Sequence, residues 1–436
     1  MRFLRTFFVE INRKYIYNIS MGKRTYEQVL YEINNARRFG NAPGVEIIGK
    51  ILQILRKTEN DLGRIPFVHI AGTNGKGSVC AFLDTIFQKA GYCTGRFTSP
   101  HLIEFEERIT VDGKMIPKAA VERIGNMLLD ADFGISLTMF DYCLMMALIY
   151  FKECGCGIMI IETGLGGRLD STNAIGTPLA EVITKIGYDH MAILGSDIRD
   201  IAAEKAGIIK EGTIVISEPQ TTLAAEVLKK SASDKNAQIS FVTDEEIEAI
   251  SHRKIGLAGT YQIENAACAL KTAKILLENK GMPDEQIEKI TTEALKQTVW
   301  PGRMEVLADK PFLLVDGAHN SNGVMALKSS LEKLYPGEKF VFFMGVMADK
   351  DYPLMIDEIL PLAKCFVTVT PDSDRALDSK KLAEFIRNRG IEVKCLMHIS
   401  DIFDMLSSTD KNIAFGSLYF IGELKEKWEN INEEHF

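Results

Sequence analysis

The chain has 436 residues, of which 46% are hydrophobic and 25% are charged, and its formal net charge is −8. A chain of this length exceeds the usual size of one hydrophobic core, so we expect a globular protein with at least two domains. The negative charge argues against nonspecific binding to nucleic acids or anionic membranes, and no apolar run approaches the roughly 20 residues of a membrane span.

The first 20 residues mix basic, acidic and apolar side chains. Glu10, Arg13 and Lys14 interrupt this segment, so it lacks the apolar core of roughly 7–15 residues that a signal peptide needs. We therefore predict that residues 1–20 are a loose extension or a non-native upstream start, and that a helix follows Met21. The eight cysteines form no C-x-x-C pair. This argues against zinc-ribbon and thioredoxin-like sites and favours a cytoplasmic protein with reduced thiols.

From residue 67 onwards, short runs rich in β-branched residues alternate with helical patterns. A buried strand over Phe67–Gly72 leads into a helix that ends at Gly91, and Asp112-Gly113 is typical of a hairpin turn. An apolar helix covers residues 139–153, and a long helical stretch covers Ile263–Lys296. Further strands are expected in residues 157–164, 180–187, 213–219 and 238–243. The alternation predicts a parallel sheet that is covered on both faces.

A second α/β unit follows a linker at Val299–Glu305, which contains both Pro and Gly. The expected strands of this unit lie in residues 312–317, 340–346, 365–370 and 391–397. We therefore predict one domain over residues 21–298 and a smaller, Rossmann-like α/β domain over residues 299–436.

The loop after the first strand has the composition of a phosphate-binding loop. Gly72, Gly75 and Gly77 permit a turn whose N–H groups face a phosphate, Lys76 supplies positive charge, and Ser78 supplies a hydroxyl for magnesium. The common pattern G-x-x-x-x-G-K-[ST] is not matched, because a glycine stands between the lysine and the serine. A glycine-rich connection without any ligand gives the same pattern, so the loop alone leaves both interpretations open.

Three polar residues follow successive predicted strands. Ser99, Glu162 and His190 each come at or just after the carboxyl end of an apolar run. Such positions can supply magnesium ligands beside a phosphate site, and a buried acid there would be costly without a cation. The alternatives are a helix cap for Glu162 and a satisfied turn or core histidine for His190.

An ordered set of motifs covers most of the chain after Met21. The motifs are GTNGKGS (Gly72–Ser78), SPHL and F-x-E-R-I (Ser99–Ile109), ETGLGGRLDSTN (Glu162–Asn173), DH (Asp189–His190), EKAGIIK (Glu204–Lys210), QIENAACAL (Gln262–Leu270), WPGRME (Trp300–Glu305), DGAHN (Asp316–Asn320), ADKD (Ala348–Asp351) and GSLYFIGEL (Gly416–Leu424). Together they resemble the folylpolyglutamate synthase and dihydrofolate synthase family of the Mur ligases, whose phosphate loop carries the same inserted glycine.

The resemblance implies a P-loop parallel-sheet ATPase domain followed by a smaller glutamate-ligase domain. It also implies ATP contacts and sites for two magnesium ions. Lys76, His190 and Lys205 would be catalytic, and Lys205 matches the lysine that the family carbamylates with CO₂. The implied ATP contacts are Asn74, Gly75, Lys76, Gly77, Ser78, Asn265, Arg303, Asp316 and His319. The implied magnesium ligands are Ser78, Ser99, Glu162, His190 and Lys205.

The implied reaction is the ATP-dependent addition of L-glutamate to folates, and also to dihydropteroate, through an acyl phosphate. We expect a monomer that acts on small molecules and has no nucleic-acid or membrane partner. The pteroate pocket would involve Pro43, Gly44, Val45, Thr138, Leu169, Asp170 and Ser171.

Three positions depart from the family pattern, where Tyr261 replaces a histidine, Asp141 a glutamate and Ser321 a proline. One alternative function is a cell-wall Mur ligase. Such enzymes usually carry a whole domain before the phosphate loop, whereas only 71 residues precede Gly72 here. A second alternative is a P-loop module that binds a nucleotide to regulate a partner.

Overall fold

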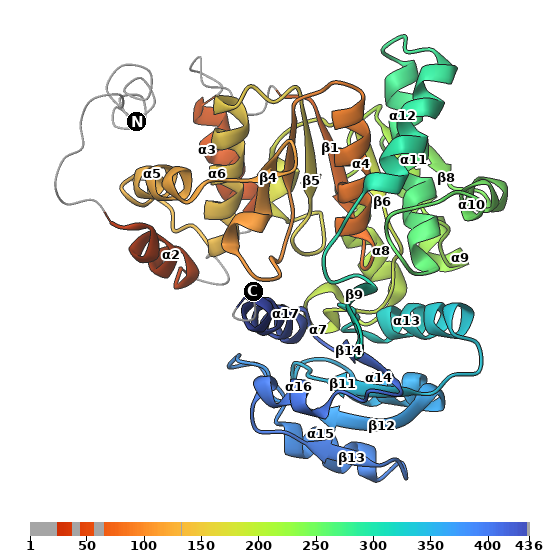
Figure 1. Cartoon of the computed structure of the whole chain (residues 1–436). Helices are drawn as coiled ribbons and strands as arrows, with labels where there is room; N and C mark the ends of the chain where they lie inside the picture. Colours follow the sequence, from red (N-terminus) through yellow and green to blue (C-terminus); the bar gives the residue numbers. More distant parts are fainter. Residues whose placement is uncertain (1–23, 37–43, 56–64, 132, 434–436) are drawn as a thin grey trace.

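The computed structural model describes residues 24–36, 44–55, 65–131 and 133–433. Pro43 and the predicted extension over residues 1–20 lie outside these residues. The chain builds two sheets, each with helices on both faces (Figure 1). This agrees with the alternation of strands and helices in the sequence.

The first sheet has eight strands in the order β4-β3-β2-β5-β1-β6-β7-β8. The six strands from β2 to β8 in this order run parallel, and β3 and β4 add an antiparallel edge. As predicted, Asp112 and Gly113 form the hairpin turn between β3 and β4, with φ angles of 49° and 73°. The strands are β1 (Phe67–Ala71), β2 (Thr94–Phe97), β3 (Ile109–Val111), β4 (Lys114–Met115), β5 (Ile158–Glu162), β6 (Ala180–Ile183), β7 (Ile214–Ser217) and β8 (Gln238–Phe241).

Successive strand residues enter opposite core layers, as the period of two requires. In β5, Met159 and Ile161 pack with α2, α3, α5 and α6, whereas Ile158 and Ile160 pack with α4, α11 and α12. A third cluster joins α8 and α9 to the sheet. The helices are α2 (Tyr26–Asn34), α3 (Gly44–Leu55), α4 (Lys76–Lys89), α5 (Lys118–Leu129), α6 (Met139–Glu153), α7 (Met191–Leu194), α8 (Ile198–Ala206), α9 (Thr222–Ser233), α10 (Asp244–Ser251), α11 (Tyr261–Glu278) and α12 (Asp284–Gln297).

The predicted single helical stretch over Ile263–Lys296 is wrong. The structure has two helices there, α11 and α12. Gly281 adopts a left-handed φ of 79°, and Pro283 caps the start of α12 in an extended conformation. Neither conformation continues an α-helix, so the chain turns between the two helices.

The second sheet has six strands in the order β13-β12-β11-β14-β10-β9. Five are parallel, and β9, which the sequence did not predict, pairs antiparallel with β10 at the edge. The elements are β9 (Glu305–Asp309), β10 (Phe312–Val315), α13 (Ser321–Leu334), β11 (Phe340–Met344), α14 (Tyr352–Ile359), β12 (Ala363–Thr368), α15 (Ser379–Arg387), β13 (Val393–Cys395), α16 (Ile402–Met405), β14 (Lys411–Phe415) and α17 (Leu418–Glu433).

We place the boundary between the two domains at residues 298 and 299, because α12 ends at Gln297 and the next strand belongs to the second sheet. Figure 1 shows α13 and α17 of the second domain on the side that faces the first domain. All eight cysteines are free thiols. Within the described part of the chain, no helix combines the length and the apolar character that crossing a membrane requires.

Candidate active site

The carboxyl ends of four neighbouring strands converge on one edge of the first sheet. The four strands are neighbours in the order β2-β5-β1-β6. Ser99 follows β2, and Glu162 is the last residue of β5. The loop Gly72–Gly75 follows β1, and His190 comes after β6. Because the four strands are parallel, these groups meet at a single edge, which is where ligands bind in open α/β sheets. The structure thus brings together the residues that the sequence singled out.

The loop between β1 and α4 is held by the two residues that directly follow the neighbouring strand β6. The Thr184 hydroxyl donates to the carbonyl of Asn74 at 2.6 Å, and the N–H of Thr73 donates to Lys185 at 2.9 Å. Gly75 precedes α4 with a φ of 91°, and no side chain among the described residues caps this helix end. The first N–H groups of α4 are therefore available to a phosphate.

The buried Glu162 and the partly exposed Lys76 form an ion pair beside this loop. The Lys76 Nζ atom lies 3.7 Å from Glu162 Oε1, and Glu162 Oε2 accepts a hydrogen bond from the N–H of Ser99 at 3.2 Å. Burial raises the pKa of Glu162, although the charge of Lys76 opposes this shift. A buried carboxylate whose charge is costly without a nearby cation is a suitable ligand for a metal ion.

Lys205 reaches the same loop from α8. Its Nζ atom donates to the carbonyl of Gly72 at 2.8 Å, and the residue is 4% exposed. Burial, assisted by the charge of Lys76, lowers the pKa of Lys205 to about 7. A substantial share of this amine is therefore neutral near pH 7.

His190 occupies the start of α7 with a left-handed φ of 50°. Partial removal of the imidazole from water lowers its pKa to about 4, despite the neighbouring Asp189 carboxylate, although 39% of the side chain stays exposed. A neutral imidazole is the form that binds a metal ion. The positive φ is uncommon for a non-glycine residue and directs the chain at this point into the site.

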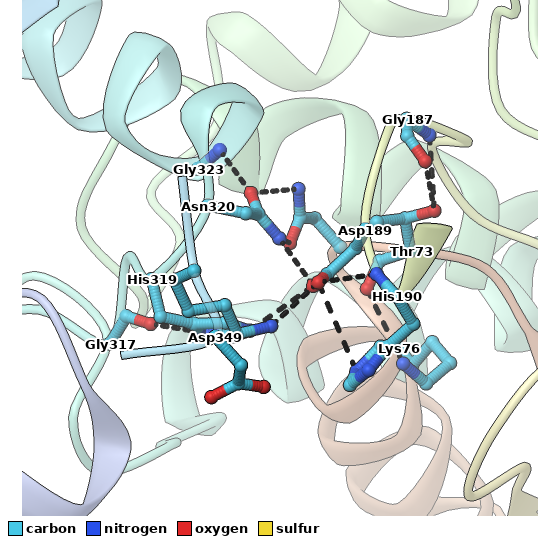
Figure 2. A network of polar contacts seen from close by, with 12 residues as sticks. Thr73, Lys76, Gly187, Asp189, His190, Gly317, His319, Asn320, Gly323 and Asp349 are labelled. Carbon is cyan, nitrogen blue, oxygen red and sulfur yellow. Dashed lines mark hydrogen bonds and ion pairs between the residues drawn. The ribbon is translucent and has the colours of Figure 1, made fainter. Parts of the chain in front are cut away.

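Asp189 joins the two domains. Its Oδ1 atom accepts from Lys350 Nζ at 2.6 Å, its Oδ2 atom accepts from Asn320 Nδ2 at 2.9 Å, and His319 Nε2 lies 3.6 Å away. Asn320 also exchanges hydrogen bonds of 3.1 Å with Asn74 of the phosphate loop (Figure 2). Burial disfavours the charge of Asp189, but the close approach of His319 and the charge of Lys350 outweigh it and hold the pKa well below its usual range.

A cavity of about 610 Å³ lies above the phosphate loop and between the domains. In its wall, the Tyr261 hydroxyl donates to Asp316 Oδ2 at 2.8 Å, so the tyrosine at this variant position orients the carboxylate. Burial raises the pKa of Asp316, and the nearby Arg303 opposes that shift. All the predicted ATP contacts and magnesium ligands line this cavity, namely Asn74, Gly75, Lys76, Gly77, Ser78, Ser99, Glu162, His190, Lys205, Asn265, Arg303, Asp316 and His319.

A second cavity of about 840 Å³ adjoins the first. Of the predicted pteroate residues, Gly44, Thr138, Leu169, Asp170 and Ser171 line it. Val45 is not in its wall, but its N–H donates to the carbonyl of Leu169 at 3.2 Å.

The polar residues of this second wall are held by one another. Buried Asp141 accepts from the Thr138 hydroxyl at 2.8 Å and from the Ser171 hydroxyl at 2.5 Å. Asp170 accepts from the N–H groups of Gly164 and Leu165 at 3.0 and 2.9 Å, so its carboxylate shapes the loop after β5. The two hydroxyls and the loop are therefore fixed before any ligand arrives.

The donor set fits magnesium bound together with a nucleotide. Among the described residues, no three or more His, Cys, Asp or Glu side chains gather where they could hold a metal ion by themselves. Magnesium, however, is usually held by one or two carboxylates together with substrate phosphates and water. The buried Glu162 beside the open end of α4 meets that requirement.

The sequence singled out neither Asp189 and Lys350 nor the arginines of the second cavity, Arg108, Arg168 and Arg375, as site residues. Asp189 lies in the DH motif and Lys350 lies in the ADKD motif. These two motifs were the sequence signal that could have identified them as site residues. Arg375 lies in no motif, and only the fold brings it to the cavity.

Comparisons with known proteins agree with this geometry. Residues 70–273 match the Mur ligase middle domain, and residues 302–414 match the Mur ligase glutamate ligase domain. A dihydrofolate synthase/folylpolyglutamate synthase of Bacillus subtilis is 34% identical over 436 aligned residues, which cover 92% of this chain and 99% of that protein. A dihydrofolate synthetase of Saccharomyces cerevisiae is 32% identical over 419 residues, with 87% and 96% covered.

Among solved structures, a folylpolyglutamate synthase of Mycobacterium tuberculosis complexed with ADP superimposes with a TM-score of 0.83 at 26% identity. The match covers 92% of this chain and 98% of that one. The predicted fold class and family are thereby confirmed. The chain belongs to the folylpolyglutamate synthase and dihydrofolate synthase family of the Mur ligases.

Proposed function

We propose that this protein uses ATP to join L-glutamate to folates, and also to dihydropteroate, through an amide bond. The observation that carries this proposal is that the two cavities lie side by side. The cavity above the phosphate loop and the cavity with the predicted pteroate residues share eight wall residues, among them Ser99, His190 and His319. A nucleotide and an acidic acceptor could therefore meet at one place.

The reaction would have two steps. A carboxylate oxygen of the acceptor takes the terminal phosphoryl group of ATP, which leaves ADP and an acyl phosphate. The glutamate amine then forms a bond to the acyl carbon and loses a proton, and inorganic phosphate departs. Lys76 and the first N–H groups of α4 would stabilise charge on the phosphoryl oxygens. Arg108, Arg168, Lys350 and Arg375 in the second cavity wall suit substrates with several carboxylates.

Magnesium would be held by Glu162 and His190, with Ser78 and Ser99 alongside, and would neutralise charge on the phosphate oxygens. Lys205 would join this set as a carbamate. Its neutral amine adds to CO₂ with the loss of one proton, and the product presents anionic oxygens instead of an ammonium group. The low exposure and the lowered pKa of Lys205 support this role.

The test offers purified protein, with Mg-ATP and L-glutamate, either dihydropteroate or tetrahydrofolate monoglutamate, and identifies the products by mass. We expect both acceptors to gain glutamate, with one ADP released for each bond. Product from the monoglutamate alone would remove the dihydropteroate activity. If neither acceptor reacts, the folate assignment fails, and a cell-wall precursor should be tested next.

A further inference from the structure

Trp300 lies in the segment between α12 and β9, and its indole packs on the phosphate loop. A Cβ atom added to Gly77 would lie 2.7 Å from Cζ2, 2.8 Å from Nε1 and 2.9 Å from Cε2 of the indole. These are contacts that real side chains essentially never make, so the ring needs a glycine there. The glycine between Lys76 and Ser78 thus leaves the space that the linker tryptophan fills.

Arg96, a residue of strand β2, contacts the face of the indole. The guanidinium carbon of Arg96 lies 5.0 Å from the ring centroid, a cation–π distance. Arg96 Nη1 in turn lies 3.0 Å from Asp84 Oδ2, and Asp84 is 2% exposed in the middle of α4. The ring is therefore tied to both the start and the middle of the helix that follows the phosphate loop.

Two residues after Trp300, the chain is already hydrogen-bonded to the segment that follows β10 in the second sheet. The carbonyl of Gly302 accepts from the N–H of Gly317 at 2.8 Å, and the N–H of Gly302 donates to Glu305 Oε2 at 2.7 Å. Arg303, the next residue, lines the nucleotide cavity, and its Nη1 atom donates to the carbonyl of Gly302 at 3.1 Å. A short backbone segment thus separates the anchor on the first domain from the cation in the cavity.

We propose that Trp300 is a positioning residue that sets the place of Arg303 relative to phosphates on the loop. This inference rests on the proposed function, because it takes ATP as the ligand of the loop. Ring displacement shifts the linker, and Arg303 moves with it. The effect belongs to phosphoryl transfer rather than to nucleotide binding, since Lys76 and the N–H groups of α4 stay in place.

The activity test compares four variants with the wild type: Trp300→Phe, Trp300→Leu, Gly77→Ala, and the double variant of Gly77→Ala with Trp300→Leu. We expect kcat to fall about tenfold or more in Trp300→Leu and in Gly77→Ala, with the Kd for ADP of Trp300→Leu within about threefold of wild type. Trp300→Phe should keep most of the activity. In the double variant kcat should fall no more than about twofold below Trp300→Leu, because the three atoms nearest to the added methyl group all belong to the indole.

A fluorescence test works without turnover. The chain has two tryptophans, and Trp428 packs against Phe403 in the second domain. In a Trp428→Phe protein, Trp300 is the sole tryptophan, and its emission should shift when ADP binds. As a control, the Trp428→Phe protein should have the activity of the wild type.

Multiplicative losses in the double variant would overturn the proposal, and so would an unchanged kcat in Trp300→Leu or an emission insensitive to ADP. A loss seen only in thermal stability, with kcat preserved in the folded fraction, would assign Trp300 to packing alone and would also overturn it. If wild-type protein fails to ligate glutamate to any folate, the proposed function fails separately, and the ADP and fluorescence measurements still decide the role of Trp300.

Discussion

Lys205 is a buried side chain whose proposed carbamate would reverse its usual charge. It lies against the carbonyl of Gly72 in the phosphate loop, and the nearby Lys76 is a second cation. Two ammonium groups and a magnesium ion in one small space would repel each other. A carbamate on Lys205 would remove one positive charge and add a negative one, whereas Lys76 must stay cationic to bind phosphate.

This difference between the two lysines predicts opposite responses to added carboxylic acids. We expect Lys205→Ala to lose activity by about two orders of magnitude or more and to recover part of it with acetate or propionate, which replace the missing carboxylate oxygens. Lys76→Ala should lose activity equally and recover none, because its role needs a cation. Steady-state ADP release with and without the acids provides the measurement. Full activity in unsupplemented Lys205→Ala would contradict the carbamate.

At the scale of elements, strand β1 carries a fully buried histidine, His69, which contacts Thr172 directly after Ser171 of the second cavity wall. His69 Nε2 lies 2.8 Å from the Thr172 hydroxyl, and Nδ1 has no partner among the described residues. Burial, with a smaller contribution from the charge of Lys210, lowers the pKa of His69 to about 3. The folded protein therefore keeps His69 neutral at pH values where the unfolded chain binds a proton.

His69 should thus make the fold sensitive to acid. Below about pH 6.5 the unfolded state takes up a proton that the folded state refuses until about pH 3, so stability is lost as pH falls through this window. We expect His69 to add up to about 1.4 kcal/mol per pH unit to the slope of the unfolding free energy. His69→Gln should reduce that slope, and His252→Gln, at an exposed position, should not. Denaturant unfolding from pH 4 to 7 measures both slopes, and equal slopes in His69→Gln and wild type would contradict the assignment.

The sequence predicted elements best where the pattern is local. The apolar runs that became β1, β5, β6 and β11 face two apolar layers, and the Asp112-Gly113 turn requires left-handed φ angles that these residues tolerate. The edge strand β9 has a weaker pattern because only three apolar residues lie between Glu305 and Asp309, and the central strand β14 was not predicted either. The break between α11 and α12 was readable from Gly281 and Pro283, and its omission was an error of interpretation.

Contacts between distant segments set the limit of prediction for the site. The rule that ligands bind at the carboxyl ends of parallel strands correctly predicted that Ser99, Glu162 and His190 lie at one edge of the sheet. This rule requires only that neighbouring strands run parallel. The ion pair of Asp189 with Lys350 joins residues 161 positions apart in different domains. No local pattern in a single sequence encodes such a pair, so the tie between the domains came only from the fold.

For the whole molecule, this ion pair should govern how the domains meet. Both side chains are 10% exposed, and loss of one charge from a buried pair leaves the other unpaired. We expect Asp189→Asn and Lys350→Met each to lower kcat about tenfold or more, with little change in ADP affinity, and the double variant to be no worse than the poorer single variant.

A control variant and a scattering measurement check this expectation. Lys328→Met removes an ion pair with Glu358 that lies within the second domain, at 3.0 Å, and should leave kcat near that of the wild type. Small-angle scattering should show a larger radius of gyration for Asp189→Asn than for Lys328→Met. Additive losses in the double variant, or identical scattering for all proteins, would show that the pair does not hold the domains.

The shared wall between the two cavities also matters for inhibitor design. Leu165, Leu194 and Leu418, together with Pro100, line both cavities, so the two cavities are immediate neighbours. A synthetic molecule that carries a phosphate mimic at one end and an aromatic acid at the other could occupy both at once. Its second end would bind at the high effective concentration set by the tether, and avidity could then exceed the affinity of either half by orders of magnitude.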